Sequence, residues 1–203
     1  LHKEYHDEEW SKKGGDFQMV QLWVNLPKKD KSTPPKYQAL TTDNIKKVEL
    51  DNKAGTLELI AGEYKGTKGA ATTFSPIHMM NAKLNKGGKA DFNFPAHFTT
   101  TLLVIEGSIK VNGKEEIPTD HLALMDRKGE EFQLEATEDA IVLVLSGEPL
   151  NEPIAAHGPF VMNTEAELQE AFYEFRKNQF GGWPWGEEES DIIVDKDKGR
   201  FAS

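Results

Sequence analysis

Apolar and polar residues alternate over short runs through most of the chain, with the period of two that is typical of half-buried β-strands. Residues 20–26 (VQLWVNL) place an apolar residue at every second position and end before Pro27. Residues 57–60, 101–105 and 141–145 are further runs rich in Leu, Ile and Val, enough to form a core. The pattern predicts an all-β fold.

Turn residues separate the short runs between residues 45 and 150. The clearest turn is Asn112-Gly113, which lies between runs at residues 108–111 and 114–117. Both turn residues tolerate a positive φ, so this pair predicts a β-hairpin. Many short strands with such turns predict a closed or nearly closed antiparallel barrel over residues 45–150.

The apolar period becomes helical near the end of the chain. Thr164 and Glu167 have the spacing of a capping box, in which each side chain accepts a hydrogen bond from the other residue's backbone N–H. We therefore expect one helix over residues 165–179, closed by Gly181 and followed by a surface tail at residues 182–203. Its apolar stripe, expected to pack against a barrel, consists of Leu168, Ala171, Phe172 and Phe175.

Composition narrows the range of partners. The net charge of −10 argues against direct binding of nucleic acid, because phosphate binding depends on clustered Lys and Arg. The densest basic run, at residues 28–31, is interpreted as a solvated loop between domains. No apolar run approaches the roughly 18 residues that cross a membrane. With no cysteine there is no disulfide or thiolate chemistry, which is consistent with a cytoplasmic protein.

Several ordered strings resemble the pirin family. Residues 21–27 (QLWVNLP), followed by residues 34–38 (PPKYQ), resemble the segment that leaves the family's first cupin barrel and crosses to the second. Residues 147–153 (GEPLNEP) and 157–164 (HGPFVMNT) resemble its C-terminal signature. The similarity covers nearly everything from residue 1 to residue 181.

The pirin resemblance implies a cupin fold, in which each barrel is a double-stranded β-helix or jelly roll. This chain would hold one complete barrel, part of a second barrel and one C-terminal helix. The expected domains are the end of the N-terminal barrel at residues 1–27, a linker at 28–44, the C-terminal barrel at 45–163, the helix at 164–181 and the tail at 182–203.

The resemblance also implies a metal site. In pirins three histidines and a glutamate hold one iron in the N-terminal barrel, as an early His-x-His pair and a later His-x-Glu pair. The later pair resembles His2 and Glu4, which carry over as ligands for Fe(II) or another divalent transition metal. No His-x-His occurs in the 203 residues, and the chain opens on Leu1. We therefore expect most of the first barrel to be missing from this chain.

The chemistry of this pair agrees with such a site. Residues i and i+2 of a strand point to the same face, so His2 and Glu4 can reach one ion. An imidazole and a carboxylate with open positions are typical of non-haem iron oxygenases. His6 continues the same face, but the family pattern assigns no ligand there. At a chain end the same spacing is also typical of a solvated surface.

The second barrel can be compared with the general cupin pattern, Gly-x5-His-x-His-x3-4-Glu-x6-Gly. We place His97 near its first ligand position, Thr99 at the second His, and Leu103 or Val104 at the Glu. Phe132 falls near the His of the second cupin motif. One imidazole without a carboxylate predicts no metal in this barrel.

The other histidines are interpreted as structural. His78, beside Met79, is expected to pack, and His121, like His97, to be an ordinary strand or loop residue. His157 is expected to hold the C-terminal segment through a hydrogen bond. Neither a nucleophile elbow nor a phosphate-binding loop is present in the sequence.

Three candidate functions remain for this protein. The resemblance implies an enzyme similar to quercetin 2,3-dioxygenase, which opens a flavonol-like small molecule with O2, with Glu4 as the catalytic proton acceptor. The second is a redox-sensitive regulatory protein that acts through a protein partner. The third is a structural half-barrel without activity in this truncated form. None of the three involves direct nucleic-acid or membrane binding.

Overall fold

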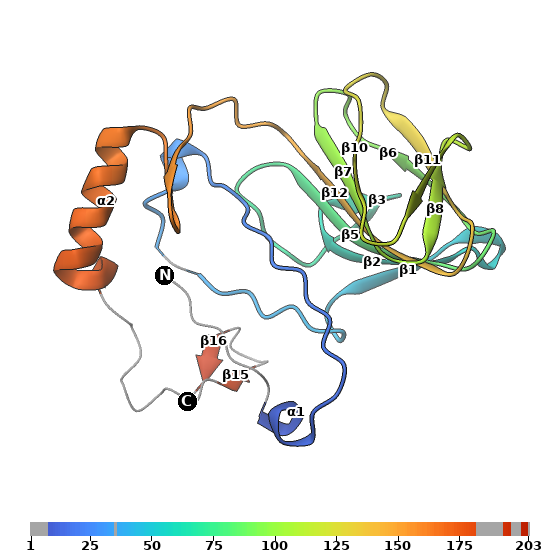
Figure 1. Cartoon of the computed structure of the whole chain (residues 1–203), viewed down its shortest axis with the longest axis horizontal. Helices are drawn as coiled ribbons and strands as arrows, with labels where there is room; N and C mark the ends of the chain where they lie inside the picture. The colour runs from blue at the N-terminus through green and yellow to red at the C-terminus, as the bar shows by residue number, and fades with distance from the viewer. Residues whose placement is uncertain (1–7, 35, 182–192, 196–199, 203) are drawn as a thin grey trace. The chain divides into compact units, whose positions relative to one another are not determined.

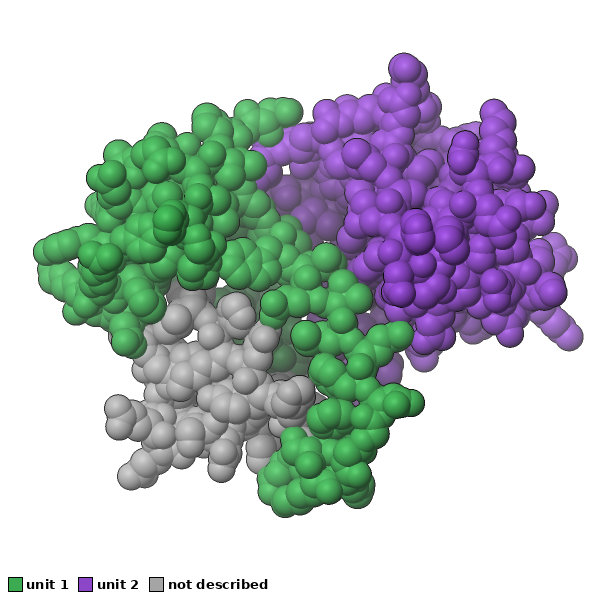
Figure 2. All heavy atoms as spheres, viewed as in Figure 1, with its two compact units in different colours: residues 1–39, 151–203 green, residues 40–150 purple. Residues whose placement is uncertain are grey.

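The computed structural model describes residues 8–34, 36–181, 193–195 and 200–202 (Figure 1). The chain divides into two compact units (Figure 2). The sandwich unit comprises residues 40–150, and the terminal unit comprises residues 1–39 and 151–203.

Two antiparallel sheets form the sandwich unit. The larger sheet has the strand order β1 (Lys46–Glu49), β2 (Gly55–Ala61), β5 (Ile77–Leu84), β12 (Ala140–Gly147), β7 (Thr99–Glu106) and β10 (Leu122–Leu124). The smaller sheet has the order β6 (Lys89–Asn93), β11 (Glu131–Ala136), β8 (Ser108–Val111) and β9 (Glu115–Pro118). A short hairpin of β3 (Glu63–Tyr64) and β4 (Thr67–Lys68) and a 3-10 turn at Asp51–Lys53 complete this unit.

The core of the sandwich unit lies between the two sheets, because alternate residues of each strand point inward. Leu59 of β2 and Leu102 of β7 are 0% exposed, as is Leu134 of β11 in the smaller sheet. Each fully buried Leu of this kind contributes about 2 kcal/mol to folding. The all-β prediction is confirmed, although the strands pair within two separate sheets of a sandwich and not in one continuous barrel.

The predicted hairpin at Asn112-Gly113 is confirmed. Asn112 and Gly113 have φ angles of 52° and 66°, the left-handed values that this turn requires. The N–H of Lys114 donates to the carbonyl of Val111 at 3.1 Å. The turn therefore sets the register of β8 and β9, in which Val111 pairs with Glu115.

The terminal unit contains the long helix α2 (Glu165–Asn178). Its capping box is formed as predicted by Thr164 and Glu167. The helix ends before the predicted Gly181, because Gln179 already adopts a left-handed φ of 52°. Other elements of this unit are α1 (Glu8–Lys13), 3-10 turns at Lys28–Asp30 and Gln179–Gly181, and the strands β13 (Ala155–His157), β14 (Phe160–Met162), β15 (Ile193–Asp195) and β16 (Arg200–Ala202).

The apolar stripe of α2 packs against the hairpin of β13 and β14 within the terminal unit. Leu168 and Ala171 are buried. The ring of Phe160 in β14 lies 4.4 Å from that of Phe172 and 5.6 Å from that of Phe175, measured between ring centroids. This hairpin therefore supplies an apolar partner for the helix.

The prediction of a strand at residues 20–26 is wrong. The backbone there is irregular, and Val20, Leu22 and Val24 are 40 to 50% exposed. An alternating pattern forms a strand only where a second strand pairs with it. The short helix α1 was not predicted either, since six residues leave too little periodicity to recognise.

Candidate metal centre

The predicted metal ligands His2 and Glu4, and the neighbouring His6, lie outside the residues that the structure describes. Within the described residues, no three His, Asp or Glu side chains are grouped so that they could hold a metal ion. The ligand positions of the cupin pattern in the sandwich unit do lie among the described residues.

The pattern aligns differently with the sequence when it is counted from its two glycines. Counted from Gly88, the spacing Gly-x5-His-x-His-x3-Glu-x6-Gly places Phe94 and Ala96 at the two His positions and Thr100 at the Glu position, and it ends at Gly107. The earlier alignment on His97 and Thr99 was wrong, because it started from the nearest histidine and not from the two glycines.

His97 belongs to the loop between β6 and β7. Its side chain is 65% exposed, and its Nε2 lies 3.6 Å from a carboxylate oxygen of Glu148. Phe94 is by contrast buried, with 4% exposure. The inward position of the pattern thus carries an aromatic ring, while the imidazole three residues later faces solvent.

Aromatic rings fill the end of the sandwich where the ligand positions meet. Phe132, at the His position of the second motif, stacks on Phe92 with 5.1 Å between ring centroids and an interplanar angle of 15°. Phe94 lies 5.8 Å from each of these two rings. Phenyl rings offer no lone pair to a divalent ion, so these positions do not form a ligand set.

A row of three polar side chains crosses the inner face of the larger sheet beside these rings. Ser146 of β12 pairs in register with His78 of β5 and with Thr100 of β7. The buried hydroxyl groups of Thr100 and Ser146 lie 2.8 Å apart and form a hydrogen bond. Thr100 therefore has its polar group satisfied within the protein, at the position where the pattern would place a carboxylate.

His78 packs as predicted, with its ring 4.6 Å from that of Phe94. Burial lowers its pKa below the ordinary value of 6.5, so the ring is neutral at neutral pH. The N–H of Glu63 donates to Nδ1 of His78 at 3.3 Å, so the neutral ring carries its proton on Nε2. This side chain is the only imidazole of the polar row.

The two other described histidines have local roles. Nδ1 of His121 lies 2.9 Å from the carbonyl oxygen of Thr119. His157 was predicted to hold the C-terminal segment by a hydrogen bond, whereas the structure shows an edge-on contact with the ring of Phe172, at 5.6 Å between centroids. The segment is therefore held to α2 through aromatic packing.

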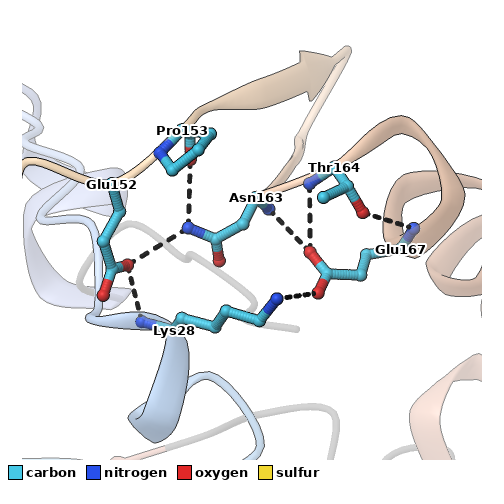
Figure 3. Close-up of polar contacts among 6 residues, drawn as sticks. All are labelled: Lys28, Glu152, Pro153, Asn163, Thr164 and Glu167. Carbon is cyan, nitrogen blue, oxygen red and sulfur yellow. Dashed lines mark hydrogen bonds and ion pairs between the residues drawn. The ribbon is translucent and has the colours of Figure 1, made fainter.

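A polar cluster in the terminal unit was not predicted from the sequence (Figure 3). The backbone N–H of Lys28 donates to Glu152 at 2.8 Å, and its ammonium group lies 2.8 Å from the carboxylate of Glu167. Glu167 also accepts from the N–H groups of Asn163 and Thr164, at 3.1 and 3.0 Å. The basic run at residues 28–31 was interpreted as a solvated loop, but its first residue is bound to the C-terminal segment.

Asn163 lies at the centre of this cluster and is 4% exposed. Its amide donates to Glu152 at 3.1 Å and to the carbonyl of Pro153 at 3.0 Å. The hydrogen bond between Lys28 and Glu167 raises the pKa of the ammonium group and lowers that of the carboxyl group. Both side chains reach solvent, so their ion pair adds little to the free energy of unfolding. Its main effect is to hold the two side chains in position.

No helix in the described part of the chain combines the length and the apolar character that spanning a membrane requires.

Two curated relatives are similar to most of this chain. A candidate quercetin 2,3-dioxygenase of Pseudomonas aeruginosa is 42% identical over 180 residues, which cover 89% of this chain and 63% of that protein. Mouse Pirin is 35% identical over 80% of this chain and 58% of its own length. The chain thus spans less than two thirds of these relatives.

Solved structures agree with the fold. The crystal structure of quercetin 2,3-dioxygenase from Acinetobacter baumannii superposes with a TM-score of 0.75 at 48% identity, over 78% of this chain and 55% of that protein. The family model of the pirin C-terminal cupin domain matches residues 79–181. The sandwich unit therefore has a cupin fold. The chain belongs to the pirin family.

Proposed function

We propose that this chain is the greater part of a metal-dependent dioxygenase that uses O2 to open the ring of a quercetin-like flavonol. The proposal is supported by the names of two relatives that are 42% and 48% identical to it. Because the chain spans only part of each relative, the activity is proposed for the intact protein, which we expect in the cytoplasm.

His2 and Glu4 are the residues proposed to hold Fe(II) or another divalent transition metal. The observation that carries this assignment is the content of the sandwich unit, where Phe94, Thr100 and Phe132 occupy ligand positions of the cupin pattern. A metal of the intact protein must therefore take its ligands elsewhere, and an imidazole and a carboxylate suit non-haem iron.

The chemistry of the proposed site divides between the metal and Glu4. A divalent metal supplies Lewis-acid polarisation of the flavonol 3-hydroxyl and a site for O2 chemistry. Glu4 would accept the proton that the 3-hydroxyl loses on binding, since a carboxylate near a cation stays ionised at neutral pH. The sandwich unit has no catalytic role in this proposal.

The test is oxygen uptake by the intact protein with quercetin as substrate. We expect turnover by the wild type and a loss of about 100-fold or more in kcat/KM for Glu4→Gln, the typical size of a lost general base. His2→Ala should abolish turnover. His97→Ala is the matched control and should leave it unchanged.

Wild-type protein that binds a stoichiometric metal but does not consume O2 with quercetin would contradict the proposed enzyme. Full activity in Glu4→Gln would remove Glu4 from the reaction.

A further inference from the structure

Strand β6 lies at the edge of the smaller sheet. Among the described residues it pairs with β11 and with no other strand. The N–H of Phe94 donates toward the β11 side, to the carbonyl of Glu130 at 2.9 Å, whereas the carbonyl of Asp91 accepts from the Tyr64 hydroxyl at 3.0 Å. Successive residues of a strand direct their backbone polar groups to opposite sides, so Asp91 and Asn93 direct theirs away from the sheet.

A groove follows this edge. Two neighbouring pockets, of about 480 and 410 Å³, share Tyr64, Lys65, Asp91 and Gln133 as lining residues. Together their walls include every residue of β6, from Lys89 to Asn93. Five strand residues extend over roughly 16 Å, the length of a short extended peptide.

The groove is basic at one end. The pocket beside the start of β6 is lined by Lys53, Lys65, Lys86 and Lys89 against the carboxylates of Asp51 and Asp91, in a chain whose net charge is −10. Lys65 and Lys89 have acidic neighbours, Asp51 at 3.9 Å and Glu135 at 3.4 Å.

The other end of the groove is acidic. Its lining includes Glu63 and Glu131 at the far end of β6. The groove therefore has a direction along the strand, from lysine side chains near Lys89 to the carboxylate of Glu131 beside Asn93. An extended ligand with acidic residues at only one end would be held in one orientation.

The loops that carry Lys53 and Lys86 are braced against each other. The side-chain amide of Asn85 donates to the carbonyl of Lys53 at 2.7 Å, and the N–H of Lys86 donates to Asp139 at 2.8 Å. At Gly88 a Cβ would lie 2.1 Å from the carbonyl oxygen of Ala54, so only glycine allows this close approach. These contacts therefore hold the backbone in place at the basic end of the groove.

We propose that the outer edge of β6 is a docking groove for an extended peptide segment of a partner protein, with acidic residues at its C-terminal end. The segment adds to the smaller sheet as an antiparallel strand, which places its acidic end beside Lys53, Lys65, Lys86 and Lys89. Backbone hydrogen bonds to β6 provide affinity and the lysines provide selectivity, as in other cases of strand addition. The inference is independent of the proposed dioxygenase activity.

The test uses a labelled synthetic peptide, Thr-Val-Thr-Val-Thr-Glu-Asp-Glu, and the whole chain. We expect binding by fluorescence anisotropy that is about tenfold tighter than for the peptide ending in Lys-Arg-Lys, and that weakens with added salt. Amide exchange should slow on binding at Asp91 and Asn93, which face the groove, but not further at Phe92, which already pairs with β11.

Two pairs of variants separate the backbone from the charge contribution. Asn93→Pro removes one edge N–H and should weaken binding about tenfold, whereas Asn93→Thr keeps the N–H and should bind like the wild type. Reversing Lys53 and Lys86 together to Glu should also weaken binding tenfold or more. The matched control reverses the exposed Lys46 and Lys114, which do not line the groove.

Peptide affinity that is unchanged in both Asn93→Pro and the Lys53→Glu/Lys86→Glu variant would overturn the proposal. So would protection of Asp91 and Asn93 by inorganic phosphate alone, which would make the groove a small-anion site. Dimerisation of the chain in sedimentation experiments that Asn93→Pro abolishes would assign the edge to a second copy and overturn it as well.

Discussion

Residues 57–60 in the sandwich unit and residues 20–26 in the terminal unit are both strand-like in sequence, but only the first are strands. Leu57 and Leu59 pair with β1 and β5 and are 0% exposed, whereas Leu22 is 40% exposed in irregular backbone. The difference lies in the neighbours along the chain, since β2 has strands on both sides that close a core. A period of two shows what a segment can form, and a pairing partner decides whether it does.

The largest expected effect comes from opening a cavity in the sandwich core. Leu134→Ala removes a side chain that is 0% exposed and should lower the free energy of unfolding by about 3 kcal/mol. Leu22→Ala removes the same atoms from an exposed site and should change it by less than about 0.5 kcal/mol. Urea unfolding measures both, and equal losses would contradict the contrast between the two units.

The buried hydroxyl pair at the Glu position of the cupin pattern should give the next largest effect. Thr100→Val leaves the hydroxyl of Ser146 buried without its partner and should lower the free energy of unfolding by about 1–3 kcal/mol. Adding Ser146→Ala should recover part of that loss, since both groups are then apolar. A double variant whose loss in the free energy of unfolding exceeds the sum of the two single losses would contradict this.

The cap of α2 provides a smaller effect in the terminal unit. Thr164→Ala removes the acceptor for the N–H of Glu167 and should destabilise the helix by about 1 kcal/mol. Thr164→Ser keeps the hydroxyl and is the control. Thermal unfolding followed by far-ultraviolet circular dichroism measures the change, and an unaffected Thr164→Ala variant would show that the capping box contributes nothing.

The pH dependence of His78 should give the smallest effect. Its pKa in the folded protein is lowered from 6.5 by burial, so the unfolded chain binds more protons at mildly acidic pH. Stability due to neutral His78 is therefore present above pH 6.5 and is lost as the pH falls through its lowered folded pKa. His78→Gln should flatten this part of the stability profile, and an unchanged profile would exclude His78 as its source.

Local patterns in the sequence predicted the parts of the fold that local chemistry decides. The Asn112-Gly113 turn and the Thr164 cap form because each depends on residues within a few positions. The contact of Lys28 with Glu152 joins residues 124 positions apart, and no local pattern records such a pairing. The end of α2 also differed, because Gln179 took the left-handed conformation before the glycine at 181.

In the candidate site, the sequence alone also did not show which side chains point inward. The spacing between Gly88 and Gly107 was available in the sequence and identifies Phe94 and Thr100, but the alignment followed His97 because it was the nearest candidate ligand. Burial distinguishes them, since Phe94 is 4% exposed while the side chain of His97 is 65% exposed. The inward or outward direction of a side chain became clear only once the strands were paired.

Metal content of the intact protein after dialysis tests the central claim most directly. We expect one transition-metal ion per chain in the wild type and in His97→Ala, measured by inductively coupled plasma mass spectrometry. The variant carrying both His2→Ala and Glu4→Ala should lose the ion, because it removes both proposed ligands. An ion that persists in that double variant and disappears in His97→Ala or His78→Ala would place the metal in the sandwich unit and contradict the account.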